Sequence, residues 1–154
     1  MFFIFRSARP AGASRSCQTL GVLRRMNVPP APIEVAREFW RLMATNDFAA
    51  VAAVLAPEFT LEWPQSKERI RGAEAFAQMN SEYPASGPWK FSINRLVGGA
   101  TDAVSDVTIT DGAQTARAIS FFAVAQGKVT RIVEFWPEPY AAPPNRAHLV
   151  EAMQ

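Results

Sequence analysis

The sequence is poor in the residues that most often build metal centres and nucleophilic triads. Cys17 is the only cysteine and His148 the only histidine among 154 residues. A single cysteine excludes a disulfide within the chain and a metal site of the CxxC type. A single histidine excludes a metal site built on several histidines and argues against a Ser-His-Asp triad. We therefore expect no metal and no cofactor.

Long hydrophobic runs are also absent. No stretch approaches the roughly 18 apolar residues that a membrane span requires, so we expect no membrane-spanning segment. The net charge of +2 comes from the start of the chain, because residues 1–25 contain five arginines and no acid. The remainder is mildly acidic, and its charge gives no reason to expect a nucleic-acid partner.

Residues 1–26 are predicted to be a disordered leader or a mis-called extension ahead of a single domain, residues 27–154. The apolar start is too short for a secretory signal, whereas an Arg-rich, Ser-rich and acid-poor stretch is typical of a mitochondrial presequence. The favoured alternative is that translation naturally begins at Met26. We expect a cytoplasmic protein, or a mitochondrial one if residues 1–25 are a genuine presequence.

Hydrophobic periodicity predicts an α+β domain. Apolar residues at helical spacing predict helices over residues 33–44, 47–55 and 73–83, with a short strand over 59–63 and a polar loop over 64–71. From Trp89 the period changes to two, which predicts four strands over residues 89–97, 101–110, 114–125 and 127–136. Tight turns join these strands, so we expect an antiparallel meander, curved around the three helices into a cone with an apolar interior.

The last predicted strand carries the main candidate functional residue. Side chains alternate faces along a strand, so Glu134 lies between Ile132 and Trp136 on one face, while Val133 and Phe135 lie on the other. A carboxylate among apolar neighbours is either paired or shifted toward its neutral form. Glu134 is therefore a candidate general acid/base in an apolar pocket, or else a buried glutamate satisfied by Arg117 or another internal donor.

With these elements in place, the chain resembles the nuclear transport factor two-like superfamily, in its SnoaL-like (polyketide cyclase-like) branch, over residues 33–147. The resemblance rests on the element order and on three segments: residues 46–59, residues 70–76, and residues 127–140. It implies a cone of three N-terminal helices packed on a curved antiparallel sheet. The superfamily includes isomerases, epoxide hydrolases, cyclases, dehydratases and non-catalytic binders, so the fold alone does not settle the function.

The resemblance also implies roles for particular residues. Glu134 falls where cyclases and epoxide hydrolases of this fold keep an acid, and Asp106 falls where epoxide hydrolases keep a second one. Val104 replaces the arginine expected two residues before that second acid, which argues against an epoxide hydrolase. Trp63 occupies the position of the isomerase base, which argues against a ketosteroid isomerase.

The candidate site is built around two acids and a set of lining residues. Asp106 either assists Glu134, in which case mutual repulsion would separate their pKa values, or is an ordinary exposed acid near a sheet edge. The expected ligand-binding residues are Trp40, Phe59, Trp63, Tyr83, Asn80, Arg117, Phe121, Ile132 and Trp136. Two functions remain open: a cofactor-independent cyclase, isomerase or dehydratase acting on a small hydrophobic molecule through Glu134, and a non-catalytic binding or scaffold protein.

Both faces of the last two predicted strands are apolar, which predicts an assembly. Antiparallel sheets in monomers usually leave one face in water, and no further long helix is available to cover the second face. We therefore expect a homodimer packed through the outer sheet face, with Phe122, Val133 and Phe135 at its centre.

Overall fold

The computed structural model describes residues 28–153, so the predictions for the leader lie outside the described residues. Two α-helices, two 3-10 helices and six strands make up this part of the chain. Their order is α1 (Pro32–Met43), η1 (Phe48–Val54), β1 (Leu55–Trp63), β2 (Glu68–Arg71), α2 (Ala73–Glu82), β3 (Lys90–Gly98), β4 (Asp102–Thr110), β5 (Thr115–Ala125), β6 (Lys128–Phe135) and η2 (Pro144–Arg146). The α+β class is as predicted, and the predicted elements follow one another in the predicted order, with one further strand, β2, between β1 and α2.

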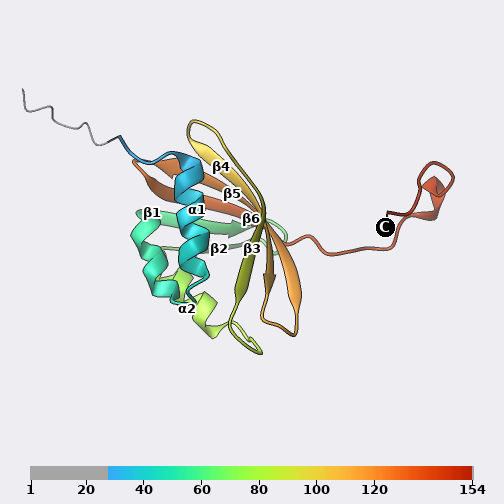
Figure 1. Ribbon diagram of the computed structural model, residues 1–154, viewed down its shortest axis with the longest axis horizontal. Coiled ribbons are helices and arrows are strands. Elements are labelled where there is room, and N and C mark those ends of the chain that lie inside the picture. The colour runs from blue at the N-terminus through green and yellow to red at the C-terminus, as the bar shows by residue number, and fades with distance from the viewer. Residues whose placement is uncertain (1–27, 154) are drawn as a thin grey trace, which may run out of the picture.

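The six strands form one curved sheet, with α1, η1 and α2 on its concave side (Figure 1). The strand order is β2-β1-β6-β5-β4-β3. The predicted meander of β3 to β6 is present, but the sheet is mixed, because β1 lies parallel to β6. This pairing places the first strand of the domain beside the last one, which brings Trp63 next to Glu134.

The prediction of a loop over residues 64–71 was wrong in its second half, where β2 pairs with β1 as an antiparallel edge strand. Its four residues are mostly charged and exposed, so they show no apolar alternation. Charged side chains and short length are common features of edge strands, because they discourage pairing with another chain. Lys67, at φ 64°, makes the turn that leads into this strand.

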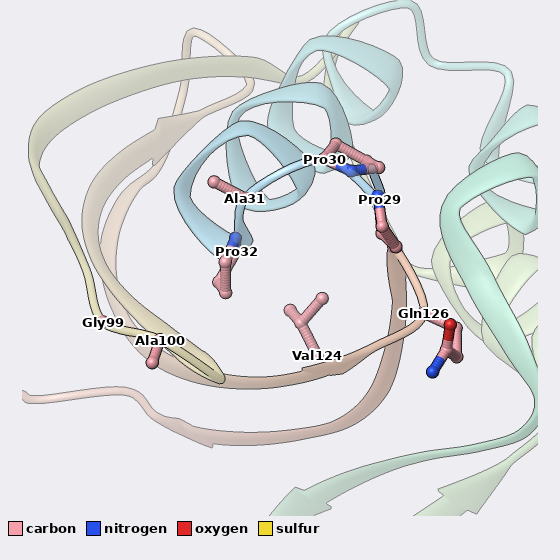
Figure 2. Close-up of a pocket in the computed structure, with 9 residues that line it drawn as sticks. Pro29, Pro30, Ala31, Pro32, Gly99, Ala100, Val124 and Gln126 are labelled. Atoms are coloured by element: carbon pink, nitrogen blue, oxygen red, sulfur yellow. The ribbon is translucent and has the colours of Figure 1, made fainter. Parts of the chain in front are cut away.

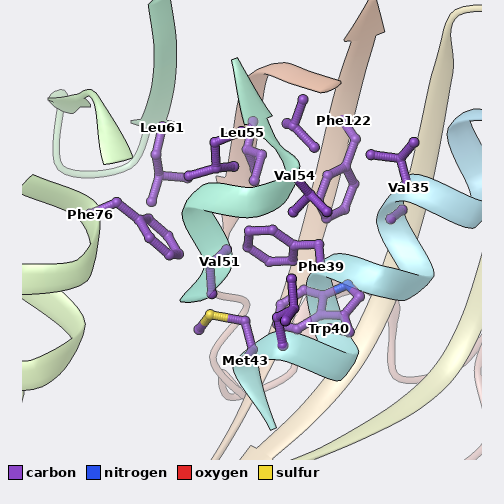
Figure 3. Packing of buried hydrophobic residues seen from close by; sticks show 14 of the residues in the cluster. Val35, Phe39, Trp40, Met43, Val51, Val54, Leu55, Leu61, Phe76 and Phe122 are labelled. Carbon is purple, nitrogen blue, oxygen red and sulfur yellow. The ribbon is translucent and has the colours of Figure 1, made fainter. Parts of the chain in front are cut away.

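The core lies between α1 and the concave face of the sheet. Pro32 suits the first helical turn, and the apolar stripe of α1 is buried along its whole length. Phe39 lies at the centre of this packing, with ring-centroid distances of 5.3 Å to Phe122 and 5.8 Å to Phe76 (Figure 3). Aromatic pairs of this kind add about 0.5–1.5 kcal/mol beyond their buried area. The helices therefore hold the concave face of the sheet in place.

The register between β5 and β6 decides which side chains reach that core. Ser120 lies opposite Glu134, and Phe121 lies opposite Val133. Phe122 is consequently on the inner face, 1% exposed, whereas Phe121 is on the outer face, 46% exposed. The prediction that Phe122 lies at the centre of the outer face was wrong, and Phe121 takes that position in contact with Phe135, at a centroid distance of 6.1 Å.

Beyond β6 the chain leaves the sheet and runs away from the body of the domain (Figure 1). Gln65 holds the base of this tail, because its amide donates to the Trp136 carbonyl at 3.3 Å and accepts from the Trp136 backbone N–H at 2.7 Å. Tyr140 and Leu149 of the tail are exposed. Among the described residues, no helix is both long and apolar enough to cross a membrane.

Candidate functional site

Glu134 is buried on the inner face of β6, with 7% of its surface exposed. Its two oxygens have different partners. The Ser120 hydroxyl on β5 donates to Oε2 at 2.7 Å, and the Trp63 indole N–H on β1 donates to Oε1 at 3.1 Å. The site is thus built where β1, β6 and β5 lie side by side in the sheet.

No arginine or lysine pairs with Glu134 among the described residues, so the possibility that Arg117 satisfies it is wrong. The alternative of another internal donor is met by Ser120 and Trp63. Burial raises the pKa of the Glu134 carboxyl, because an isolated charge is poorly solvated there. The side-chain hydrogen bonds from Ser120, Trp63 and Trp136 act in the opposite direction, since they favour the charged form, but the effect of burial is larger. Glu134 is therefore a carboxyl group that holds its proton to higher pH than an exposed glutamate.

Two serines extend this polar site across the inner face of the sheet. Ser120 lies directly opposite Glu134 on one side and directly opposite Ser105 of β4 on the other. Both serines are buried, with 0% and 1% of their surfaces exposed. Residues directly opposite each other on one face of an antiparallel pair have Cβ atoms about 4.5–5.5 Å apart. Glu134, Ser120 and Ser105 thus form one cross-strand row in an otherwise apolar interior.

An indole group lies at each end of this row. Trp63 donates to Glu134 at one end, and at the other end the Trp40 indole N–H of α1 donates to Ser105 Oγ at 3.0 Å. Trp40 is almost fully buried and packs against Phe122. We call these five residues, Trp40, Ser105, Ser120, Glu134 and Trp63, the polar row.

Three other expected lining residues lie on the same side of the sheet. Phe59 and Ile132 are fully buried in the core, and Trp136 is half-buried against it just after the end of β6. The prediction that Ile132, Glu134 and Trp136 share a face with the core therefore holds. Phe59 is packed edge-to-face with Phe76 at 5.8 Å, so it helps to hold α2 against β1.

Three of the expected site residues lie on the opposite face. Asp106 accepts hydrogen bonds from Arg117 at 2.7 Å and from Asn94 at 3.2 Å. The Arg117 guanidinium holds the pKa of the Asp106 carboxyl below its usual value. The expectation that Asp106 pairs with Glu134 was wrong because β4 directs Ser105, and not Asp106, toward the core. Phe121 belongs to the outer face as well.

The remaining two expected residues are not brought to Glu134 either. Tyr83 is exposed beyond the end of α2, where it contacts Trp89 at a centroid distance of 6.0 Å. Asn80 uses its amide on its own helix, donating to the Phe76 carbonyl at 2.9 Å. Neither side chain makes a hydrogen bond to the polar row.

A cavity of about 310 Å³ lies at the other end of β6 (Figure 2). It is lined by residues 29–32 and by the two turns that contain Gly99 and Gln126, with Val124 at its base. Gly127 also lines it, seven residues before Glu134, which corresponds to roughly 20 Å along a strand. This cavity is therefore separate from the polar row.

Sequence reasoning missed Ser105 and Ser120. A signal was present, because each is a lone hydroxyl at an inward position of a strand whose other inward residues are apolar, such as Val107 and Phe122. It also missed Gln65, which fixes the backbone of Trp136 from the β1–β2 turn.

The chain is similar in sequence and in fold to known proteins of one family. A family model described as a SnoaL-like domain matches residues 36–132. A search of curated proteins found no match. A solved structure from Kribbella flavida is 34% identical to this chain, with a TM-score of 0.73, and is described as that of a candidate ketosteroid isomerase. The match covers 80% of this chain and 90% of that one.

Two more distant solved structures share the fold alone. A protein from Burkholderia xenovorans described as NTF-2 like and of unknown function is 24% identical over 79% of this chain and 94% of its own, with a TM-score of 0.65. An LEH-like epoxide hydrolase from M. tuberculosis is 19% identical over 69% of this chain and 82% of its own, with a TM-score of 0.57.

Proposed function

Because the chain belongs to the SnoaL-like domain family, we propose that it binds a small hydrophobic molecule beside Glu134 and that this carboxyl acts on the molecule as a general acid/base. The observation that carries the proposal is a buried carboxyl without a counter-charge, at the place where three strands meet. A buried carboxylate that stays ionised is normally paired with a base, since an unpaired charge is costly.

The environment moves the Glu134 carboxyl toward the pH range in which proton transfer is most effective. Burial raises the pKa of the Glu134 carboxyl, and a general acid/base works best when its pKa lies near the operating pH. In its ionised form the carboxylate would take a proton from a carbon next to a carbonyl, leaving an enolate. In its protonated form it would return that proton to another carbon, so no oxidant or reductant is needed.

The neighbouring side chains favour an apolar substrate. Trp63 and Trp136 are only half-buried beside Glu134, and Ile132 lies next to it on the same face. A ligand that buries about 200 Å² of apolar surface would gain around 5 kcal/mol before its association cost. Apolar burial is non-directional, so the orientation of the ligand would depend on Glu134.

The proposal can be tested with a ketosteroid whose double bond is not conjugated with its carbonyl, a probe suggested by the description of the Kribbella relative. Because Trp63 occupies the position expected for the isomerase base, Glu134 would have to supply the base in this reaction. Isomerisation is followed by the absorbance of the conjugated product, and binding by the fluorescence of the tryptophans. We expect Glu134→Gln to keep binding and to lose about 10²–10⁴-fold in turnover. The matched control is Glu62→Gln, one residue from Trp63 but on the outer face, where the carboxylate pairs with Arg69 and Arg131. Turnover by Glu134→Gln at the wild-type rate would refute the catalytic role.

One observation favours a non-catalytic binding protein as the second candidate. Both oxygens of Glu134 already accept hydrogen bonds from within the protein. In that case the wild-type chain binds the probe without turning it over, and Glu134→Gln binds the probe equally well, also without turnover.

A further inference from the structure

The polar row contains one hydroxyl group that has to reverse its hydrogen bond when Glu134 changes its protonation state. The indole N–H of Trp63 can only donate, so Oε1 of Glu134 is an acceptor in both states. A proton on the carboxyl must therefore lie on Oε2, which faces the Ser120 hydroxyl at 2.7 Å. A hydroxyl can donate to a carboxylate or accept from a carboxylic acid, but it has only one hydrogen.

We propose that Ser120 and Ser105 are positioning residues for the proton on Glu134, and that the Ser120 hydroxyl turns from Glu134 to Ser105 when Oε2 is protonated. In the ionised state, Ser120 Oγ–H donates to Oε2. In the protonated state, Oε2–H donates to Ser120 Oγ, and the Ser120 hydrogen donates to Ser105 Oγ. One proton is gained at Oε2, the hydrogen bond between Glu134 and Ser120 reverses its direction, and the Ser120 hydroxyl forms a bond to Ser105 that the ionised state lacks.

The position of Ser105 supports this assignment. It lies directly opposite Ser120 in the β4–β5 register, and both side chains are buried on the same face of the sheet. The Trp40 indole donates to Ser105 Oγ at 3.0 Å and, like Trp63, it can only donate. Each end of the row is thus held by a fixed donor, and the hydroxyls of Ser120 and Ser105 between them are the groups that can turn.

Charged groups of the neighbouring elements do not face the row. The elements packed against β6 are β1, β5 and α1. On β1, Glu62 pairs with Arg131 on the outer face, and on β5, Arg117 pairs with Asp106 there. The other charged residues of these four elements are Glu58 of β1, Lys128 of β6, and Glu34, Arg37, Glu38 and Arg41 of α1, and their side chains lie toward solvent. Among the described residues, the two hydroxyls and the indoles are therefore the polar groups that can tune Glu134 at short range.

The inference rests on the proposed role of Glu134, but its test needs no substrate. The midpoint of the Glu134 titration is measured by infrared spectroscopy of the protonated carboxyl band, which is identified by its loss in Glu134→Gln. Ser120→Ala removes a donor to the charged form, so the midpoint should move to higher pH. Ser105→Ala removes the acceptor that Ser120 uses in the protonated state, so the midpoint should move to lower pH. Ser120→Thr keeps the hydroxyl and should return the midpoint toward that of the wild type.

The opposite signs distinguish this role from general support of the fold, which would move both midpoints in the same direction or neither of them. A midpoint unchanged in Ser105→Ala, or shifts of the same sign in the two alanine variants, would overturn the proposal. If an alanine variant does not fold, as judged by its thermal unfolding, the cysteine variants at both positions keep a weaker donor and acceptor and should give the same signs with smaller amplitude. An active enzyme with unshifted midpoints refutes the serine assignment alone, whereas shifted midpoints without turnover refute the catalytic role alone.

Discussion

Replacing Glu134 by glutamine should make the protein more stable at alkaline pH and leave its stability nearly unchanged in acid. Glutamine has the shape of a protonated glutamate. Its carbonyl can accept from Trp63, as Oε1 does at 3.1 Å, and its amide N–H can donate to Ser120, as a protonated Oε2 would. The variant therefore keeps both hydrogen bonds and never needs to bury a charge.

The sign follows from the raised pKa of the Glu134 carboxyl. A group that binds its proton more tightly in the folded state gives its full stabilisation below the unfolded pKa, which is roughly 4.3 for glutamate. That stabilisation is lost as the pH rises toward the folded pKa, at up to about 1.4 kcal/mol per pH unit. A chain of this size changes its Tm by about 2–4 °C per kcal/mol, so the Tm difference between variant and wild type should grow by up to roughly 3–6 °C per pH unit over that interval.

Calorimetric unfolding of both proteins between about pH 4 and about pH 9 measures this difference across the relevant pKa range. The matched control is Glu62→Gln. Its carboxylate is hydrogen-bonded to Arg131, which holds the pKa of Glu62 below its usual value, so its contribution to stability is present at neutral pH and lost in acid. The two variants should therefore show pH dependences of opposite sign. A Tm difference for Glu134→Gln that stays constant over the whole range would refute the burial of an unpaired carboxyl.

Two further predictions concern the outer face and the β4–β5 hairpin. We propose that the outer face around Phe121 and Phe135 packs against a second copy of this chain; light scattering at micromolar concentration should give a dimeric mass for the wild type and a monomeric mass for Phe121→Lys, and a monomeric wild type would contradict this. Asp111 accepts hydrogen bonds from the backbone N–H groups of Ser86 and Gln114, both at 2.8 Å, and these lower the pKa of its carboxyl. Asp111→Asn should therefore lower the Tm at neutral pH and lose that effect as the pH falls below the unfolded aspartate pKa; an equal Tm difference at every pH would show that the charge is irrelevant.

The strands and the face of Glu134 could be predicted because both depend on local alternation. Ile132 and Glu134 share a face in any straight strand, whatever lies beside it. The charged strand β2 has no such alternation, so its assignment depends on pairing with β1, which the local sequence does not reveal. The parallel contact between β1 and β6 is likewise a long-range feature.

The site was only partly predictable because its composition depends on register. Phe121 and Phe122 are equally apolar, and only the pairing of Ser120 with Glu134 shows that Phe122 faces inward. A bulge between Ala123 and Val124 shifts this pairing relative to the β5–β6 turn, so counting back from the turn does not give the correct partner. The same register explains why Ser105, and not its neighbour Asp106, belongs to the site.

The parallel pairing of β1 with β6 has a consequence for how the domain folds. Trp63 and Glu134 are 71 residues apart in the chain, and they meet only when the last strand docks beside the first. The entropy of closing a loop of that length is lost before the stabilising contacts form, so long-range pairings of this kind slow folding. The docking of β6 therefore joins the first strand to the last and, in the same event, removes Glu134 from water. No partial chain that ends before β6 contains the site.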